Sequence, residues 1–318
     1  MLRFLFHRVL QMVPVLFFVS LIIFVLINLI PGDAARVFLG EEATPEALAA
    51  LRHELGTDQP LPVQYARWVG GMLRGNFGRS FKDNTPVLPT LVQKIPVTGE
   101  LTGAALVVAW AIAIPAGVVA AWRQRTATDY GASAAALVGL SIPNFWLGIM
   151  AIYLFAVHLH WLPASGWAPL TVDASRNVRA LVMPGCVLGL VLAAVVMRQL
   201  RSSMLEVLSA DFVRTAKAKG LGQWVVLIRH ALRNAVIPVI TVMGIQMGTL
   251  LGGAVITETI FAVPGLGQLA VNSIYTRDFP MLEGVVMFSA LAILLVNLFV
   301  DVVYSLIDPR IKLAEERS

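Results

Sequence analysis

The stretch VLQMVPVLFFVSLIIFVLINLI, residues 9–30, contains no charged side chain and is apolar at nearly every position. A bilayer core needs about 20 consecutive, mainly apolar residues in a helix, so this run is long enough to cross a membrane. Arg3 and Arg8 precede it, as basic residues precede a secretory signal. The run is roughly twice as long as the apolar part of such a signal, and no small-x-small pattern closes it. It is therefore predicted to be a retained transmembrane helix.

Five further apolar runs follow the first. They occupy residues 101–122, 131–157, 181–197, 236–256 and 285–306. The whole chain of 318 residues is 58% hydrophobic and only 14% charged, a balance that does not suit a water-soluble domain, whose surface needs more polar side chains. The sequence therefore predicts an all-α, polytopic membrane protein with six transmembrane helices, beginning with residues 9–30.

The basic residues between the runs predict which side of the membrane each connection faces. Six spans place both termini on one side, and short connections rich in Lys and Arg stay in the cytoplasm. The short connections on one side carry only Arg176, Arg179 and Arg277. Those on the other side carry Arg3 and Arg8, Arg123 and Arg125, the basic residues from Arg198 to Arg233, and Arg310, Lys312 and Arg317. Both termini are therefore predicted to be cytoplasmic.

Two connections are long enough to have structure of their own. Residues 31–97 combine Gly and Pro punctuation with an amphipathic stretch at Glu46–Leu55 and with four aromatic residues, Tyr65, Trp68, Phe77 and Phe81. We expect this insert to form a periplasmic subdomain, so that the chain divides into residues 1–98 and a core of residues 99–318. The second long connection, residues 198–235, is predicted to be cytoplasmic and helical, because Leu200, Met204, Leu208 and Phe212 recur at helical spacing.

Several functions are disfavoured by what the chain lacks. The formal net charge of +5 is spread between apolar runs instead of gathering on one basic face, which argues against a nucleic-acid partner. The single cysteine, Cys186, allows no internal disulfide and no cysteine-based zinc site. No Gly-Lys pair occurs, so a phosphate-binding loop of the P-loop type is absent. His53 and Glu54 begin a zinc-protease pattern, but Thr57 occupies the position of the second zinc ligand.

The cytoplasmic connection contains a compact motif. Residues 211–221 read DFVRTAKAKGL and are followed by HALRNAVIP at residues 230–238. A glycine adopts positive φ without a steric penalty, so Gly220 suits a corner between two short helices. Small and basic neighbours would let that corner approach an acidic or polar partner closely. The alternative is an ordinary basic loop that only sets the topology.

This motif resembles the EAA loop of ABC importer permeases, with Thr215 at the position where the wider family has Glu. Other segments resemble the dipeptide, oligopeptide and nickel permeases of that family, in order along nearly the whole chain. They are residues 30–33, Gln64-Tyr65 with Trp68, residues 75–78, 141–146, 161–163, 261–267 and 308–310. The long insert after the first helix resembles the first of the two permease subunits in these systems.

The resemblance implies a type I importer fold and a set of partners. It implies that Asp211, Arg214, Thr215, Ala216, Lys217, Ala218, Lys219, Gly220 and Leu221 dock into a groove of an ATPase subunit. It further implies a second, homologous permease, two ATPase subunits that hold ATP and Mg²⁺, and a periplasmic solute-binding protein, with no cofactor on this chain. The location would be the bacterial inner membrane. Di- or oligopeptides are the first expectation for the substrate, and nickel, glutathione, opines and oligosaccharides remain alternatives. A passive channel or a membrane enzyme is disfavoured, because no filter-like charged ring and no catalytic pattern occurs.

A few polar residues inside or beside the apolar runs are candidates for the translocation path. Charged groups are costly in a membrane and often mark a transport pathway, so Glu258 at the outer end of the fifth run is expected to face the translocation cavity. Asp301 in the last run is expected to form an ion pair. Asn144, Gln246 and Thr249 would line the same cavity or, equally well, form interhelical hydrogen bonds. His158 and His160 beside Trp161 are interpreted as interfacial residues, with metal binding as the alternative.

Overall fold

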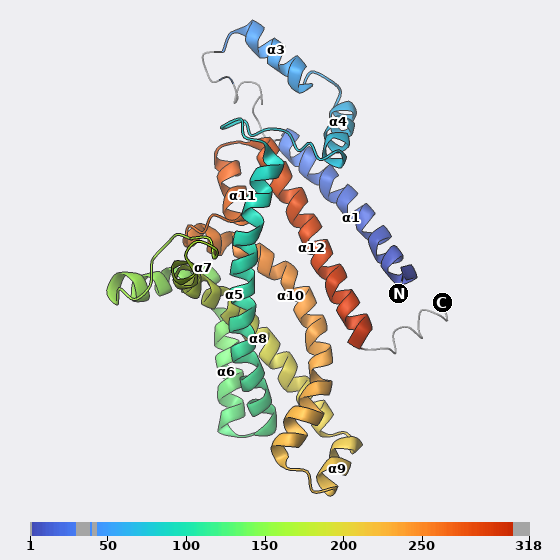
Figure 1. Cartoon of the computed structure of the whole chain (residues 1–318), viewed down its shortest axis with the longest axis vertical. Coiled ribbons are helices and arrows are strands. Elements are labelled where there is room, and N and C mark those ends of the chain that lie inside the picture. The colour runs from blue at the N-terminus through green and yellow to red at the C-terminus, as the bar shows by residue number, and fades with distance from the viewer. Residues whose placement is uncertain (1, 30–38, 40–42, 308–318) are drawn as a thin grey trace. The chain divides into compact units, whose positions relative to one another are not determined.

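The computed structural model describes residues 2–29, 39 and 43–307, and these residues form a succession of helices (Figure 1). Among the described residues the only β pairing is an isolated bridge between Arg79 and Pro86. The helices are α1 (Leu2–Leu29), α3 (Pro45–Leu55), α4 (Leu61–Leu73), α5 (Val87–Trp122), α6 (Ala127–Ser141), α7 (Asn144–Ala151), the π-helix η1 (Ile152–His158), α8 (Ala174–Leu208), α9 (Asp211–Ala218), the π-helix η2 (Val225–Leu232), α10 (Arg233–Ile260), α11 (Leu266–Tyr275) and α12 (Phe279–Ile307).

Within this part of the chain, five helices are long and apolar enough to cross a membrane, and a bent pair supplies a sixth candidate span. The five comprise Leu5–Leu29, Val87–Trp122, Ala174–Leu208, Val225–Ile260 and Phe279–Val303. The prediction of an all-α, multi-pass membrane protein is therefore confirmed. Several helices extend well beyond the apolar runs, because polar residues at their ends continue the helix outside the hydrocarbon core. The second span, for example, begins at Val87 and not at Leu101.

The third predicted span, residues 131–157, is not one helix. It is divided into α6 and a second helix of α7 and η1, with an angle of 96° between them. Proline disfavours helical backbone in the residue before it, and Ile142, which precedes Pro143, is extended with φ −82° and ψ 124°. The helix consequently ends at Ser141 and restarts in a new direction at Asn144.

The chain folds as two compact units, and the smaller comprises Met1–Val97 and Pro264–Leu294. In this unit α1 packs on α4: Ser20 and Tyr65 share a hydrogen bond of 2.8 Å between their hydroxyl oxygens, and the ring of Phe24 lies 5.8 Å from that of Trp68. The amphipathic stretch at residues 46–55 forms the predicted helix, α3, with Thr44 as its N-cap and Gly56 closing its C-terminus.

Residues 264–294 belong to this smaller unit, whereas the division drawn from the sequence placed them in the core. The buried Asp278 carboxylate explains the difference, since it accepts hydrogen bonds from the Ser80 hydroxyl at 2.5 Å and from the Phe81 backbone N–H at 3.0 Å. Val87, Leu266 and Met281 share a small apolar core in the same unit. These long-range contacts are not visible in a local sequence pattern.

The larger unit comprises Thr98–Val263 and Leu295–Ser318. Its core is formed by α5, α6, α8, η2 and α10, which bury a continuous set of Ala, Leu, Val and Met side chains. Helices α5 and α8 approach closely at Gly189, where an added Cβ would lie only 2.7 Å from the carbonyl oxygen of Ala105. A side chain at this position would force the two helices apart.

Two motifs and part of the basic pattern used in the sequence analysis lie outside the described residues. They are residues 30–33, residues 308–310, and the C-terminal basic residues Arg310, Lys312 and Arg317.

Candidate functional site

A helical hairpin at one end of the larger unit contains the motif of residues 211–221. Helix α8 ends at Leu208, α9 covers Asp211–Ala218, and the chain turns at Gly220 before it enters η2 and α10 (Figure 1). Gly220 has a φ of +78°. The corner that the sequence predicted at this glycine is confirmed.

The hydrogen bonds of this corner define a Schellman motif. The Gly220 N–H donates to the Lys217 carbonyl at 2.9 Å, and the Leu221 N–H donates to the Ala216 carbonyl at 3.3 Å. This pair of bonds satisfies carbonyls that the end of α9 would otherwise leave without partners, and it requires the left-handed conformation at Gly220. The direction in which the chain leaves α9 is thus determined by a single residue.

One face of the hairpin is anchored to the rest of the unit and the other is exposed. Val213, Ala216 and Val226 are buried and pack against Val207 and Leu208. The exposed face carries the large apolar side chains of Phe212, Leu221 and Trp224, while Val225 and Ile228 are exposed at the start of the candidate span Val225–Ile260. Apolar residues concentrated on the exposed side of a small helical hairpin are typical of a binding surface.

The same face is basic. Arg214, Lys217 and Lys219 are exposed, and the one acid in α9, Asp211, lies 3.4 Å from Arg214 in a fully solvated pair that contributes little to stability. Of the nine residues predicted to form the docking loop, Ala216 alone is buried, so it supports the surface from beneath. We call residues 211–228 the coupling hairpin.

The coupling hairpin contacts the end of α5. The rings of Trp122 and Trp224 lie 5.4 Å apart between centroids, and the guanidinium carbon of Arg123 lies 5.5 Å from the centroid of the Trp122 ring. Aromatic and cation–π contacts of this kind each contribute about 0.5–1.5 kcal/mol. These contacts join the hairpin to a helix that is long and apolar enough to cross a membrane.

A buried ion pair that the sequence analysis missed lies in the same part of the unit. Asp129 is 2% exposed and accepts two hydrogen bonds from Arg201 of α8, at 2.5 Å to Nε and 2.8 Å to Nη2. The backbone N–H of Arg125 donates to the same carboxylate at 2.9 Å. In the sequence, Asp129 lies between the basic residues Arg123 and Arg125 and the apolar run that starts at residue 131, and an acid at that position is a sign of an ion pair. Only the fold shows that Arg201 is its partner.

Glu258 is buried within this chain, and its predicted place in the translocation path stays a prediction. Its side chain is 0% exposed, and it accepts a hydrogen bond of 2.6 Å from the Thr98 hydroxyl. The reason is that α5 begins at Val87, fourteen residues before the predicted span, and so brings Thr98 against the end of α10. A buried carboxylate needs such a donor because its desolvation is costly.

A second carboxylate, that of Glu100, lies on α5 two residues after Thr98, and the sequence did not indicate a role for it. Glu100 accepts hydrogen bonds from the Trp167 indole at 2.8 Å and from the Asn177 amide at 2.7 Å. Asn177 also donates to the Ala168 carbonyl at 2.6 Å. Glu100 therefore holds the connection between η1 and α8 against α5. Glu100 directly precedes the predicted span of residues 101–122. An acid just outside a span is common, so its position gave no sign of a structural role.

The other predicted path residues are dispersed. Asn144 is half-buried and faces α10, with its amide nitrogen 3.8 Å from the point where a Cβ on Gly253 would lie. Gln246 is half-buried on α10, and Thr249 is exposed. Asp301 is half-buried on α12 and has an interaction partner, while its predicted ion pair stays a prediction. Among the described residues, no three His, Cys, Asp or Glu side chains are placed to share a metal ion.

The long apolar helices define a multi-pass membrane protein, and the coupling hairpin is an exposed, basic and partly apolar surface at one end of the larger unit. Comparison with known proteins narrows the class. The family model described as the inner membrane component of binding-protein-dependent transport systems matches residues 113–313, and a second model, for the N-terminal part of such components, matches residues 1–102. The chain belongs to this family and is a multi-pass inner-membrane protein.

Similar proteins extend over almost the whole chain. The dipeptide transport system permease protein DppB of Alkalihalophilus pseudofirmus is 41% identical over 98% of this chain and 100% of its own length. The di/tripeptide transport system permease protein DppB of Pseudomonas aeruginosa is 41% identical over 98% and 99% of the two chains. The dipeptide transport system permease protein DppB of Escherichia coli is 40% identical over the same shares.

Proposed function

We propose that this permease of an ABC importer conducts dipeptides or short oligopeptides across the inner membrane. The observation that carries the proposal is the similarity to dipeptide and di/tripeptide permeases along nearly the full length of the chain, including the insert after the first helix. In this proposal the chain pairs with a second permease and receives its substrate from a solute-binding protein in the periplasm.

The coupling hairpin is the proposed docking site for an ATPase subunit. Its exposed apolar side chains supply the area that a partner would bury, and Arg214, Lys217 and Lys219 favour a partner with acidic residues at the rim of its groove. ATP and Mg²⁺ are bound by two ATPase subunits, and this chain performs no chemistry itself. The hairpin and both termini are cytoplasmic, in agreement with the basic residues at that end.

Transport requires that the ATPases favour one conformation of the permease pair over another. A ligand shifts such an equilibrium only through its different affinities for the two states. The contacts of the coupling hairpin with α5 and with the α8 side chains beneath it are the route by which closure of the ATPases would reach the spanning helices.

The test is reconstitution of this chain in proteoliposomes with its partner permease, ATPases and binding protein. We expect the binding protein loaded with a dipeptide to stimulate ATP hydrolysis and labelled dipeptide to accumulate inside. Nickel, glutathione, an opine and an oligosaccharide are offered in parallel. ATP-dependent uptake of one of these in place of the dipeptide would refute the peptide assignment, and uptake without ATP would refute the importer.

A further inference from the structure

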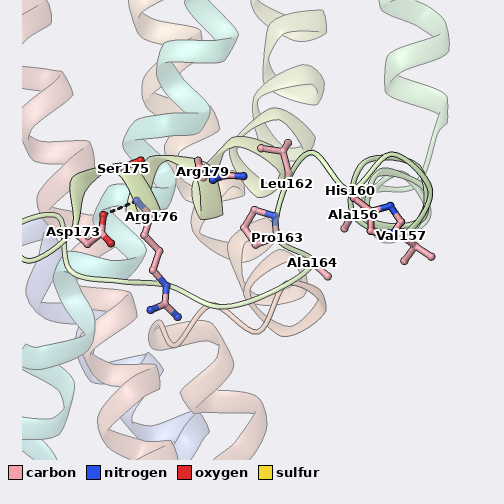
Figure 2. A pocket seen from close by; sticks show the side chains of 10 residues that line it. All are labelled: Ala156, Val157, His160, Leu162, Pro163, Ala164, Asp173, Ser175, Arg176 and Arg179. Atoms are coloured by element: carbon pink, nitrogen blue, oxygen red, sulfur yellow. Dashed lines mark hydrogen bonds between the residues drawn. The ribbon is translucent and has the colours of Figure 1, made fainter.

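The connection between η1 and α8 borders an open pocket at the opposite end of α8 from the coupling hairpin. Its volume is about 630 Å³, and it is lined by Ala156, Val157, His160, Leu162, Pro163, Ala164, Asp173, Ser175, Arg176 and Arg179. Figure 2 shows Arg176 and Arg179 on the first turns of α8 to one side, Val157 and His160 to the other, and the connecting segment between them. We call this space the α8 pocket.

The helix that leads to the α8 pocket, formed by α7 and η1, has features that suit a position along a membrane surface. It runs at 96° to α6. Phe145, Ile149, Tyr153 and Val157 follow one another at intervals of four residues and are all exposed, so they form an apolar stripe along one side. A helix with an apolar stripe that lies across the spanning direction has the character of an interfacial helix.

The depth of this helix agrees with that position. The 15 residues of α6 rise about 22 Å, at 1.5 Å per residue, whereas the hydrocarbon core is about 30 Å thick. If α6 starts at one surface and runs along the membrane normal, the helix that follows the 96° turn lies close to the opposite surface. Trp161, which is 61% exposed beside the α8 pocket, is a residue type that concentrates at that level.

The two walls of the α8 pocket differ in character. One, formed by η1 and the segment that follows it, is mainly apolar, with Ala156, Val157 and Leu162 beside the single polar side chain of His160. The other is cationic: Arg176 and Arg179 are three residues apart on one face of α8, close to its N-terminus, where the helix dipole adds positive charge. Arg179 donates one hydrogen bond, to the Trp161 carbonyl at 3.2 Å, out of the five N–H donors that a guanidinium carries.

Among the residues that line the α8 pocket, one is acidic and would repel a bound anion. The acid in the lining, Asp173, caps α8 by accepting the Arg176 backbone N–H at 2.9 Å. Its charge is therefore directed at the helix end, and the two guanidinium groups outnumber it. His160 adds a further donor on the opposite wall.

From these features we infer that the α8 pocket binds the headgroup of an anionic phospholipid. Arg176 and Arg179 would donate charge-assisted hydrogen bonds to the phosphate oxygens, a geometry for which guanidinium groups are well suited. The apolar wall of Ala156, Val157 and Leu162 would receive the beginning of the acyl chains. A site with a cationic side and an apolar side, at the level of the membrane surface, fits an amphipathic anion better than a free one.

The experiment is native mass spectrometry of the assembled transporter after titration with phosphatidylglycerol. The double variant Arg176→Gln/Arg179→Gln is expected to weaken retention of one lipid at least about tenfold, because charge-assisted hydrogen bonds are among the stronger ones. Both side chains are exposed, so the substitution leaves the core intact. Arg176→Lys/Arg179→Lys should retain part of the binding, since it keeps the charge but loses the planar fork.

Arg74→Gln, which removes an exposed arginine outside the α8 pocket, is the matched control and should retain the lipid like the parent chain. Unchanged retention in the double glutamine variant would overturn the inference. Displacement of the lipid by inorganic phosphate at equal concentration would assign the site to a small free anion and would also overturn it. A double variant that keeps its lipid but loses affinity for the binding protein would assign the arginines to that partner.

Discussion

Substitution of Gly220 by valine tests the role of the coupling hairpin directly. Gly220 has φ +78°, and an added Cβ would meet no atom within 4 Å, so the cost within this chain comes from the backbone alone. A β-branched residue in the left-handed region costs about 1–2 kcal/mol. If the turn relaxes to avoid this strain, it gives up the two hydrogen bonds of the Schellman motif, each with a net contribution of about 1 kcal/mol.

Either outcome reduces the population of the native turn by a factor of roughly 5–30, because 1–2 kcal/mol corresponds to that range. The new side chain also projects from the exposed face on which an ATPase would dock. We therefore expect Gly220→Val to insert in the membrane and to bind its partner permease, but to copurify poorly with the ATPases. ATP hydrolysis should no longer respond to the loaded binding protein.

Two further variants separate backbone strain from steric intrusion. Asparagine tolerates the left-handed conformation, so Gly220→Asn should retain most of the coupling. Gly222 is exposed two residues further along and does not have positive φ, so Gly222→Val adds the same bulk without the strain. If Gly220→Val binds its ATPases and imports normally, or if Gly220→Asn and Gly220→Val fail equally, the reasoning from the turn is wrong.

Three other outcomes are expected. In a cysteine-free background, a single cysteine at position 82 should react with an impermeant thiol reagent from the periplasm and one at position 219 only from the cytoplasm; the reverse pattern would invert the proposed topology. Glu258→Gln should leave the protein yield unchanged, because the amide oxygen still accepts the hydrogen bond from Thr98. It should lower uptake, because an acid at the end of a span is lost, and equal uptake would make the residue structural. Asp129→Asn should lower the free energy of unfolding by about 1.5–3 kcal/mol, as expected for hydrogen bonds to charged groups, measured by thermal melting in detergent; an unchanged melting temperature would show that the pair with Arg201 contributes no net stability.

Features that depend on local chemistry were predicted well. The lengths of the apolar runs gave the class of fold, and the motif around Gly220 gave the corner of the coupling hairpin, because the conformational freedom of glycine is a property of that residue alone. The amphipathic stretch of residues 46–55 likewise contains its own capping residues and forms α3.

Features that depend on partners distant in sequence were not predicted. Glu258 was expected in a cavity because an acid at the end of a span suggests a pathway, and nothing in the local pattern indicated that Thr98 would bury it. The carboxylate of Asp129 accepts hydrogen bonds from Arg201, which is 72 residues away in the sequence. That of Asp278 accepts one from Ser80, which is 198 residues away. The break at Pro143 was visible as a proline, but a proline alone does not distinguish a gentle kink from a change of direction by 96°.

Helix α8 runs without interruption from the α8 pocket to the coupling hairpin, despite Pro184 in its interior. Its 35 residues give a rod about 52 Å long. A rod of this length acts as a lever, since a tilt of about 5° moves its far end by roughly 4–5 Å, nearly the rise of a full helical turn. Because Gly189 lets α5 lie directly against it, the two helices would tilt together. In the proposed transporter, a small movement at the coupling hairpin would thus displace the opposite end of α8 by the width of a side chain, without any helix having to unwind.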